Sequence, residues 1–204
     1  MKQHYQIARD LLEIKAVQIK TEGYFTWTSG IQSPIYCDNR LTMSYPEVRN
    51  RIIDGFIQKM KTFDVQPDVI AGCATAGIPH AAWIADRLDL PMVYVRSSPK
   101  GHGKGNQIEG IVKQGQKVLV VEDLISTGGS SIDTANVLKA EGVEVVGVIA
   151  IFTYGLKESI RRFENEAIPF TTLTGFDYLV EALVEDKEIT ETDQKKLIDW
   201  RDNL

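Results

Sequence analysis

The sequence predicts an α/β fold in which a parallel β-sheet core is flanked by helices on both faces, with a smaller N-terminal addition. From residue 68 onward, short apolar runs alternate with segments of helical periodicity, which is typical of parallel sheets. The runs are apolar at almost every position, as in Val118–Val121, so both faces of the sheet should be covered. At 204 residues, the chain is long enough for one well-buried core, and we expect a single domain over 1–204.

The N-terminal subregion, residues 1–65, predicts a helix, short strands and a second helix. One apolar helical face is formed by Ile7, Leu11 and Ile14. Residues 25–27 and 33–37 are strand-like and are separated by a break at Ser29-Gly30. Pro46 suits the first turn of a helix that runs to about Lys61.

Strands and helices then alternate. The expected strands are 69–72, 92–96, 117–122, 143–153 and 170–173. The expected helices are 77–88, 129–141, 158–166, 178–185 and a last one that Thr190 caps. We expect residues 97–110 to be a polar loop.

Composition and charge exclude several classes of protein. The net charge of −5 disfavours a protein that binds nucleic acid through phosphate contacts, although it permits a small anionic ligand. No run approaches the roughly 18 to 20 apolar residues of a membrane helix, and no signal-peptide pattern opens the chain. We therefore expect a cytoplasmic protein that binds neither nucleic acid nor membrane. Cys37 and Cys73 should be reduced, and they are too few to hold zinc.

One segment carries the clearest chemistry. It reads Val118-Leu119-Val120-Val121-Glu122-Asp123-Leu124-Ile125-Ser126-Thr127-Gly128-Gly129-Ser130-Ser131. Two acids follow a buried strand at the sheet edge where ligands bind in α/β proteins. The Ser/Thr/Gly turn then leads into a helix, whose free N–H groups and positive dipole end suit a phosphate. The Gly-Lys-Ser/Thr ending of a Walker loop is missing. The pattern therefore suits a sugar phosphate, with acceptors for hydroxyls beside donors for phosphate.

This segment closely resembles the binding motif of type I phosphoribosyltransferases for PRPP (5-phosphoribosyl-1-diphosphate). The resemblance implies their fold, with residues 1–65 as a hood and 66–175 as the PRPP-binding core. It implies that Glu122 and Asp123 bind the ribose hydroxyls, with Asp123 also catalytic. The other expected PRPP contacts in this segment are Leu124, Ile125, Ser126, Thr127, Gly128, Gly129 and Ser130. Ser126 is also expected to contact the base.

A second motif covers residues 96–106, which are basic and glycine-rich. Such a loop suits a lid that closes over a diphosphate and stabilises the charge of the leaving group. It resembles the catalytic loop of orotate phosphoribosyltransferases, which implies that Arg96, Lys100 and His102 contact the diphosphate of PRPP. Lys100 is then the expected catalytic residue of the loop. In that family the loop reaches the neighbouring subunit's site, so we expect a homodimer.

Two further stretches resemble the same family, namely the hairpin from Phe25 to Tyr36 and the turn from Gly72 to Pro79. The implied reaction joins orotate and PRPP to give orotidine 5′-monophosphate and diphosphate, in the pathway to UMP. The implied cofactor is Mg²⁺, held mainly by PRPP rather than by a metal site of the protein. The last fifty residues add little to the resemblance.

The chain also departs from the family pattern. Many relatives have Lys where Thr28 and Ala76 stand, and an Arg for the orotate carboxylate just after the strand at 145–151. Here Phe152-Thr153-Tyr154 follows instead. Arg40 is a candidate pocket cation, but a surface salt bridge explains it equally well.

Two other functions stay open from the sequence alone. A purine or uracil phosphoribosyltransferase would share the PRPP turn but should lack the hairpin at 25–36 and the lid. A regulatory protein that senses PRPP would need a nucleic-acid-binding module or a basic face, and the net charge weighs against it.

Overall fold

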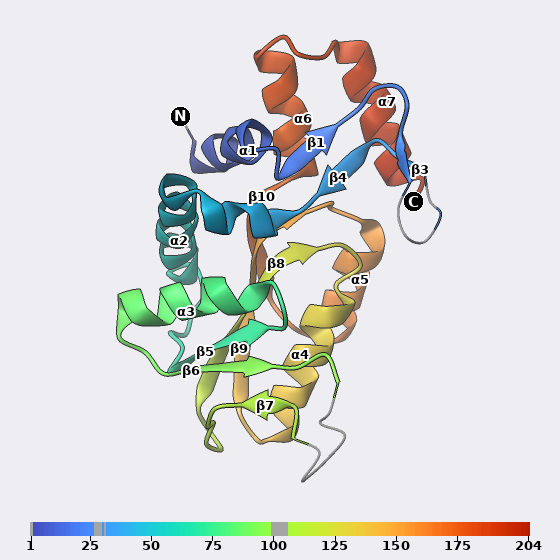
Figure 1. Ribbon diagram of the computed structural model, residues 1–204. Coiled ribbons are helices and arrows are strands. Elements are labelled where there is room, and N and C mark those ends of the chain that lie inside the picture. The colour runs from blue at the N-terminus through green and yellow to red at the C-terminus, as the bar shows by residue number, and fades with distance from the viewer. Residues whose placement is uncertain (1, 27–29, 31, 99–105) are drawn as a thin grey trace.

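The computed structural model describes residues 2–26, 30, 32–98 and 106–204, and it confirms the predicted α/β fold (Figure 1). Its centre is a six-stranded sheet in the order β10-β9-β8-β5-β6-β7. These strands span Phe170–Gly175, Glu144–Thr153, Lys117–Ile125, Val69–Cys73, Met92–Val95 and Ile108–Glu109 respectively. All neighbours are parallel except β6 and β7, which are antiparallel.

Helices cover both faces of this sheet. Seven α-helices lie in the described residues, namely α1 (Gln3–Glu13), α2 (Pro46–Met60), α3 (Gly77–Leu88), α4 (Gly129–Ala140), α5 (Lys157–Asn165), α6 (Phe176–Glu185) and α7 (Glu191–Asp202). The helices α2 and α3 lie on one side of the sheet, and α4 and α5 on the other (Figure 1). The side chains of β8 alternate accordingly. Leu119 and Val121 join the apolar cluster on the α2 and α3 side, and Val118 and Val120 join the cluster on the other side.

The N-terminal subregion adds two short two-stranded sheets, which pair β1 (Val17–Ile19) with β4 (Ile35–Cys37) and β2 (Phe25–Thr26) with β3 (Gln32–Ser33). The sequence did not predict β1, and residues 27–29 and 31 lie outside the described part. A 3₁₀ helix, η1 (Asn39–Ser44), leads into α2 and was also missed. Because α1 and α2 bury residues in the same cluster as the sheet, this subregion shares the main core.

Two predictions for the core need correction. The segment 97–110, expected to be a loop throughout, contains the edge strand β7, which is only two residues long and gives little periodic signal. The strand expected at 117–122 continues to Ile125, because β9 goes on pairing with it after β5 has ended. Among the helices of the described residues, none is long and apolar enough to cross a membrane.

Candidate active site at the carboxyl edge of the sheet

The two acids lie where the sheet loses one neighbour of β8. Pairing between β5 and β8 ends at Gly72 and Val121, whereas pairing with β9 continues to Ile125. Glu122 and Asp123 are therefore held by backbone pairing on one side and open to the carboxyl edge on the other. This placement fixes the direction of both carboxyl groups, which a loop after the strand would not do.

Glu122 connects β8 to the start of α4. Its Oε2 accepts a hydrogen bond of 2.8 Å from Ser130 Oγ, and its Oε1 accepts one of 3.0 Å from the Asp123 backbone N–H. The side chain is 5% exposed, and burial together with the neighbouring charge of Asp123 raises the pKa of Glu122 to about 8. Burial also raises the pKa of Asp123. Hydrogen-bond donors or cations that favour the charged form of these two carboxyl groups would therefore be bound favourably here.

The turn between β8 and α4 presents backbone donors at the same edge. Gly128 has a φ of +81°, a conformation that favours glycine, and a Cβ there would lie 2.8 Å from Phe163 Cε2. No side chain of the described residues caps α4, so its first-turn N–H groups are available to an anion. Arg162 of α5 adds positive charge, because its guanidinium nitrogens lie 3.7 Å from the Cβ position built at Gly129.

A second helix begins beside the acids. A Cβ at Gly77, the first residue of α3, would lie 2.3 Å from the carbonyl oxygen of Val121. Only glycine therefore lets α3 start directly against β8. The preceding turn is tied to β6 by a 3.0 Å hydrogen bond from Ala74 N–H to the carbonyl of Val95. Two helix N-termini thus meet at one edge, which suits a ligand with two phosphate groups.

Hydrogen bonds join the two residues at the ends of the segment expected to form the lid. Arg96 N–H donates to the carbonyl of Gln107 at 2.9 Å, and Gln107 Nε2 donates to the carbonyl of Arg96 at 3.1 Å. The guanidinium of Arg96 lies 3.6 Å from Glu109 Oε1. A cavity of about 290 Å³ separates Arg96 and Gln107 from Ser130 and Asp133. Lys100 and His102, which the sequence singles out, lie outside the described residues.

The N-terminal subregion reaches the acid pair through η1. Asn39 is 1% exposed, and its Nδ2 donates a 2.8 Å hydrogen bond to the backbone carbonyl of Asp123. Next to it, Arg40 forms a two-point ion pair with Asp38, with Nε 2.6 Å and Nη2 2.9 Å from its carboxylate oxygens. Tyr36 is 41% exposed and lies 5.8 Å from Phe25, ring centre to ring centre. These residues form an open aromatic and charged side of the site.

Sequence reasoning missed the roles that geometry gives to Asn39 and Arg162. Neither stands in a recognisable motif, and each is brought to the site by the packing of a helix onto the sheet. Their nearest sequence signal was weak. Asn39 stands two residues after the end of β4, and Arg162 lies on a helix after the next core strand.

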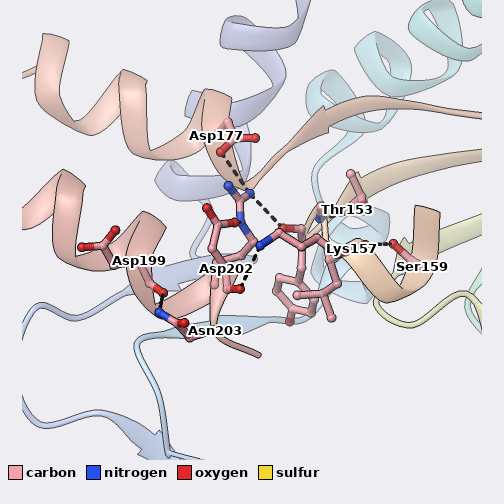
Figure 2. Close-up of polar contacts among 11 residues, drawn as sticks. Thr153, Lys157, Ser159, Asp177, Asp199, Asp202 and Asn203 are labelled. Atoms are coloured by element: carbon pink, nitrogen blue, oxygen red, sulfur yellow. Dashed lines mark hydrogen bonds and ion pairs between the residues drawn. The ribbon is translucent and has the colours of Figure 1, made fainter. Parts of the chain in front are cut away.

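The C-terminal helices hold the segment that follows β9, where relatives are expected to carry an arginine. Tyr154 is 5% exposed, and burial raises its pKa. Arg201 of α7 lies 3.5 Å from the carbonyl of Tyr154 and is ion-paired with Asp177 of α6 at 3.0 Å. Figure 2 shows Asp177, Lys157 and Asp202 converging here from three helices, with Lys157 Nζ 3.2 Å from the carbonyl of Asp202. This segment is therefore braced from behind.

The described residues offer no metal cage of their own, since no three His, Cys, Asp or Glu side chains gather in them. A hard cation such as Mg²⁺ prefers several oxygen ligands. Cys37 and Cys73 are both free thiols, as expected.

A larger groove of about 820 Å³ lies away from this edge, between α1, β1 and the end of α6. Arg9 crosses it and pairs with Glu185 at 2.9 Å and with Asp186 at 2.7 Å. None of the acids, glycines or hydroxyls of the candidate site lines it. The sheet edge gathers hydrogen-bond donors that can bind an anion, which favours that edge as the functional site.

Comparison with known proteins gives a consistent result. Residues 44–173 match the family profile described as the phosphoribosyl transferase domain. The orotate phosphoribosyltransferase of Oceanobacillus iheyensis is 57% identical over 199 residues, which cover 98% of both chains. That of Fusobacterium nucleatum is 55% identical and covers 98% of this chain and 95% of its own. The crystal structure of the Aeropyrum pernix orotate phosphoribosyltransferase superposes with a TM-score of 0.77 at 28% identity, covering 87% of this chain and 97% of the other.

Proposed function

Because this chain belongs to the orotate phosphoribosyltransferase family, we propose that the carboxyl edge of its sheet binds PRPP and orotate in the geometry described above. The enzyme is a pentosyltransferase that transfers ribose 5-phosphate from PRPP to orotate, giving orotidine 5′-monophosphate and diphosphate. The observation that carries the proposed geometry is the 2.8 Å contact between Glu122 and Ser130. This contact supports the proposal, because it joins an acid proposed to bind the ribose hydroxyls to a residue of the turn proposed to bind the 5′-phosphate.

We assign the ribose 5-phosphate to residues 122–130. Glu122 and Asp123 accept hydrogen bonds from the 2′ and 3′ hydroxyls, and the turn from Leu124 to Ser130 surrounds the phosphate with backbone N–H groups and hydroxyls. Arg162 adds a cation beside that turn. Ser126 and Thr127 are both partly exposed and can face the substrates, Ser126 toward orotate.

The diphosphate of PRPP is assigned to the side of β6. The N-terminus of α3 and the side chain of Arg96 face this side, and Lys100 and His102 of the lid complete it. Phosphoribosyltransferases generally use Mg²⁺ with PRPP, and here the ion would be held mainly by the substrate. When bound, Mg²⁺ supplies positive charge to the diphosphate as it leaves.

Catalysis then depends mainly on position and charge. The C1–diphosphate bond stretches first, and N1 of orotate attacks C1 from the opposite face. Orotate is nucleophilic as its anion, so the protein needs no strong general base. Holding the two substrates in line lowers the barrier, and cations around the departing diphosphate stabilise its developing charge. Asp123 would keep the ribose oriented during this step.

We further propose that the enzyme works as a cytoplasmic homodimer, in which the lid with Lys100 serves the partner subunit's site. The relatives that match nearly the full chain are named orotate phosphoribosyltransferase. They therefore do not favour the alternatives of a purine or uracil enzyme or a PRPP sensor. Loss of absorbance of orotate in the presence of PRPP and Mg²⁺ tests the reaction. Conversion of adenine or uracil but not of orotate would contradict it.

Lys100→Ala tests the lid. Turnover should fall by about 100-fold to 1,000-fold, by analogy with lost oxyanion donors, while the KM for PRPP changes much less. Lys113→Ala is the matched control, because Lys113 is an exposed lysine that lies after β7 and outside the lid. Equal turnover of Lys100→Ala and wild type would remove Lys100 from the mechanism. Mixing Lys100→Ala with Asp123→Asn subunits should restore part of the activity if the lid serves the neighbouring site.

A further inference from the structure

The two substrates carry three separate anionic groups, and arginines of the described residues flank the acid pair on three sides. The substrates bring a 5′-phosphate, a diphosphate and the carboxylate of orotate. Arg162 lies beside Gly129 on the 5′-phosphate side, and Arg96 stands at the base of the lid on the diphosphate side. Arg40 lies on the third side, where η1 meets Asp123. This distribution leaves Arg40 facing the part of the site that takes the base.

The backbone and side chains around Arg40 fix its place. The side chain of the preceding residue, Asn39, donates a 2.8 Å hydrogen bond to the carbonyl of Asp123, which holds this part of η1 next to the acids. Asp38 accepts from the Arg40 backbone N–H at 3.2 Å and from Nε and Nη2 of its side chain. Its charge also reaches the site, because burial raises the pKa of Asp123 and the positive charge of Arg40 opposes that rise.

The guanidinium has donors to spare. It carries five N–H groups, and Asp38 accepts from Nε and Nη2 only. The side chain is also 63% exposed, so an anion can approach it from solvent. A planar edge of this kind matches a carboxylate in a two-point hydrogen bond. Asp38 thus orients a cation that still has capacity for a second anion.

Other cations near the base side are less suitable. Arg201, which lies behind Tyr154, is 10% exposed and already pairs with Asp177 and Asp202. Lys20 lies 4.3 Å above the ring of Phe25 and lines the groove between α1 and α6 rather than the sheet edge. Thr28, where many relatives have lysine, has no charge to offer.

We propose that Arg40, oriented by Asp38, binds the carboxylate of orotate and thereby selects orotate over bases without a carboxylate. The proposal rests on the proposed function of the sheet edge. It places the specificity for the base in η1, a segment outside every motif of the PRPP site. Arg40 replaces the arginine that relatives are expected to carry after the strand corresponding to β9.

The test compares Arg40→Gln with wild type in initial-rate assays of orotate consumption with PRPP and Mg²⁺. We expect the KM for orotate to rise by about tenfold to 100-fold, which is about 1.4 to 2.7 kcal/mol, while the KM for PRPP stays within about twofold. Arg40→Lys should recover part of the loss, and Asp38→Asn should raise the KM for orotate less than Arg40→Gln does. The matched control is Arg87→Gln, because Arg87 is also a half-exposed arginine paired with one aspartate, at 2.9 Å from Asp54.

A second measurement separates a carboxylate contact from a structural role. The carboxamide analogue of orotate should inhibit Arg40→Gln almost as strongly as it inhibits wild type. The preference of the enzyme for the carboxylate over the carboxamide should therefore be smaller in Arg40→Gln. An unchanged KM for orotate in Arg40→Gln would overturn the proposal, as would an equal rise in the KM for PRPP. A larger effect of Lys20→Gln would reassign the role to Lys20. Turnover of orotate by the wild-type enzyme supports the proposed function whatever the Arg40 variants show. If the wild-type enzyme does not turn over orotate, the proposed function itself is refuted.

Discussion

Glu122→Gln should change how the stability of the unliganded enzyme depends on pH. In the folded protein, burial and the charge of Asp123 raise the pKa of Glu122 to about 8, against an ordinary value of 4.5. The folded state therefore holds a proton that the unfolded state has released, and the free energy of unfolding falls as pH rises between these values. Between about pH 5.5 and pH 8.5 the loss should be about 3 kcal/mol.

Gln cannot ionise, but it keeps an oxygen to accept from Ser130, so its fold is preserved and this loss disappears. Urea unfolding at both pH values, without substrates, measures the change in each protein. The difference between the two proteins isolates Glu122 from the other titrating groups, and Glu141→Gln on the exposed end of α4 is the control. If Glu122→Gln loses as much stability as wild type over the same range, the carboxylate is not protonated in the folded state. Wild type should also release protons when it binds PRPP with Mg²⁺, since ligands that favour the charged form lower this pKa.

Two further changes probe the packing behind the site. Burial between Phe56 and Trp83 lowers the pKa of His80 to about 4, so the folded state should lose about 2 to 3 kcal/mol as pH falls from about 6.5 to 4. His80→Leu should remove that loss in urea unfolding at pH 7 and pH 4.5, and parallel losses in both proteins would contradict it. Gly77→Ala should destabilise the fold by about 1 to 3 kcal/mol and raise the KM for PRPP, because the added Cβ lies 2.3 Å from the carbonyl of Val121. A Gly77→Ala enzyme with wild-type stability and KM would show that α3 can shift without affecting the site.

The sequence predicted the parts of the fold that depend on local pattern. Continuous apolar runs identified the parallel strands and their helices. The run Val118–Val121 followed by two acids predicted a ribose-phosphate site at the end of this strand, and that site stays a prediction. The missed elements β1, η1 and β7 are each six residues or shorter. Pairing with distant strands stabilises β1 and β7, so their own residues carry little periodicity. The same reason explains why β8 runs past Glu122.

The base side of the site was harder to predict. From the sequence, Arg40 fits a pocket cation and a surface salt bridge equally well, because one residue in a sequence does not show which partner it faces. Arg40 does form an ion pair with Asp38, and the hydrogen bond from the neighbouring Asn39 to Asp123 brings η1 next to the acid pair. The roles of Lys100 and His102 stay predictions, since both lie outside the described residues. Tertiary packing, rather than any motif, supplies this information.

The paired ends of the lid have a practical consequence for engineering. Arg96 and Gln107 are joined by two hydrogen bonds of 2.9 and 3.1 Å, so the chain leaves and re-enters the sheet at adjacent points. The sheet therefore fixes the ends whatever is placed between them. Doubling the length of such a connection costs only about 0.6 kcal/mol of closure entropy. A short affinity sequence inserted between these ends, away from Lys100 and His102, should therefore leave the core intact.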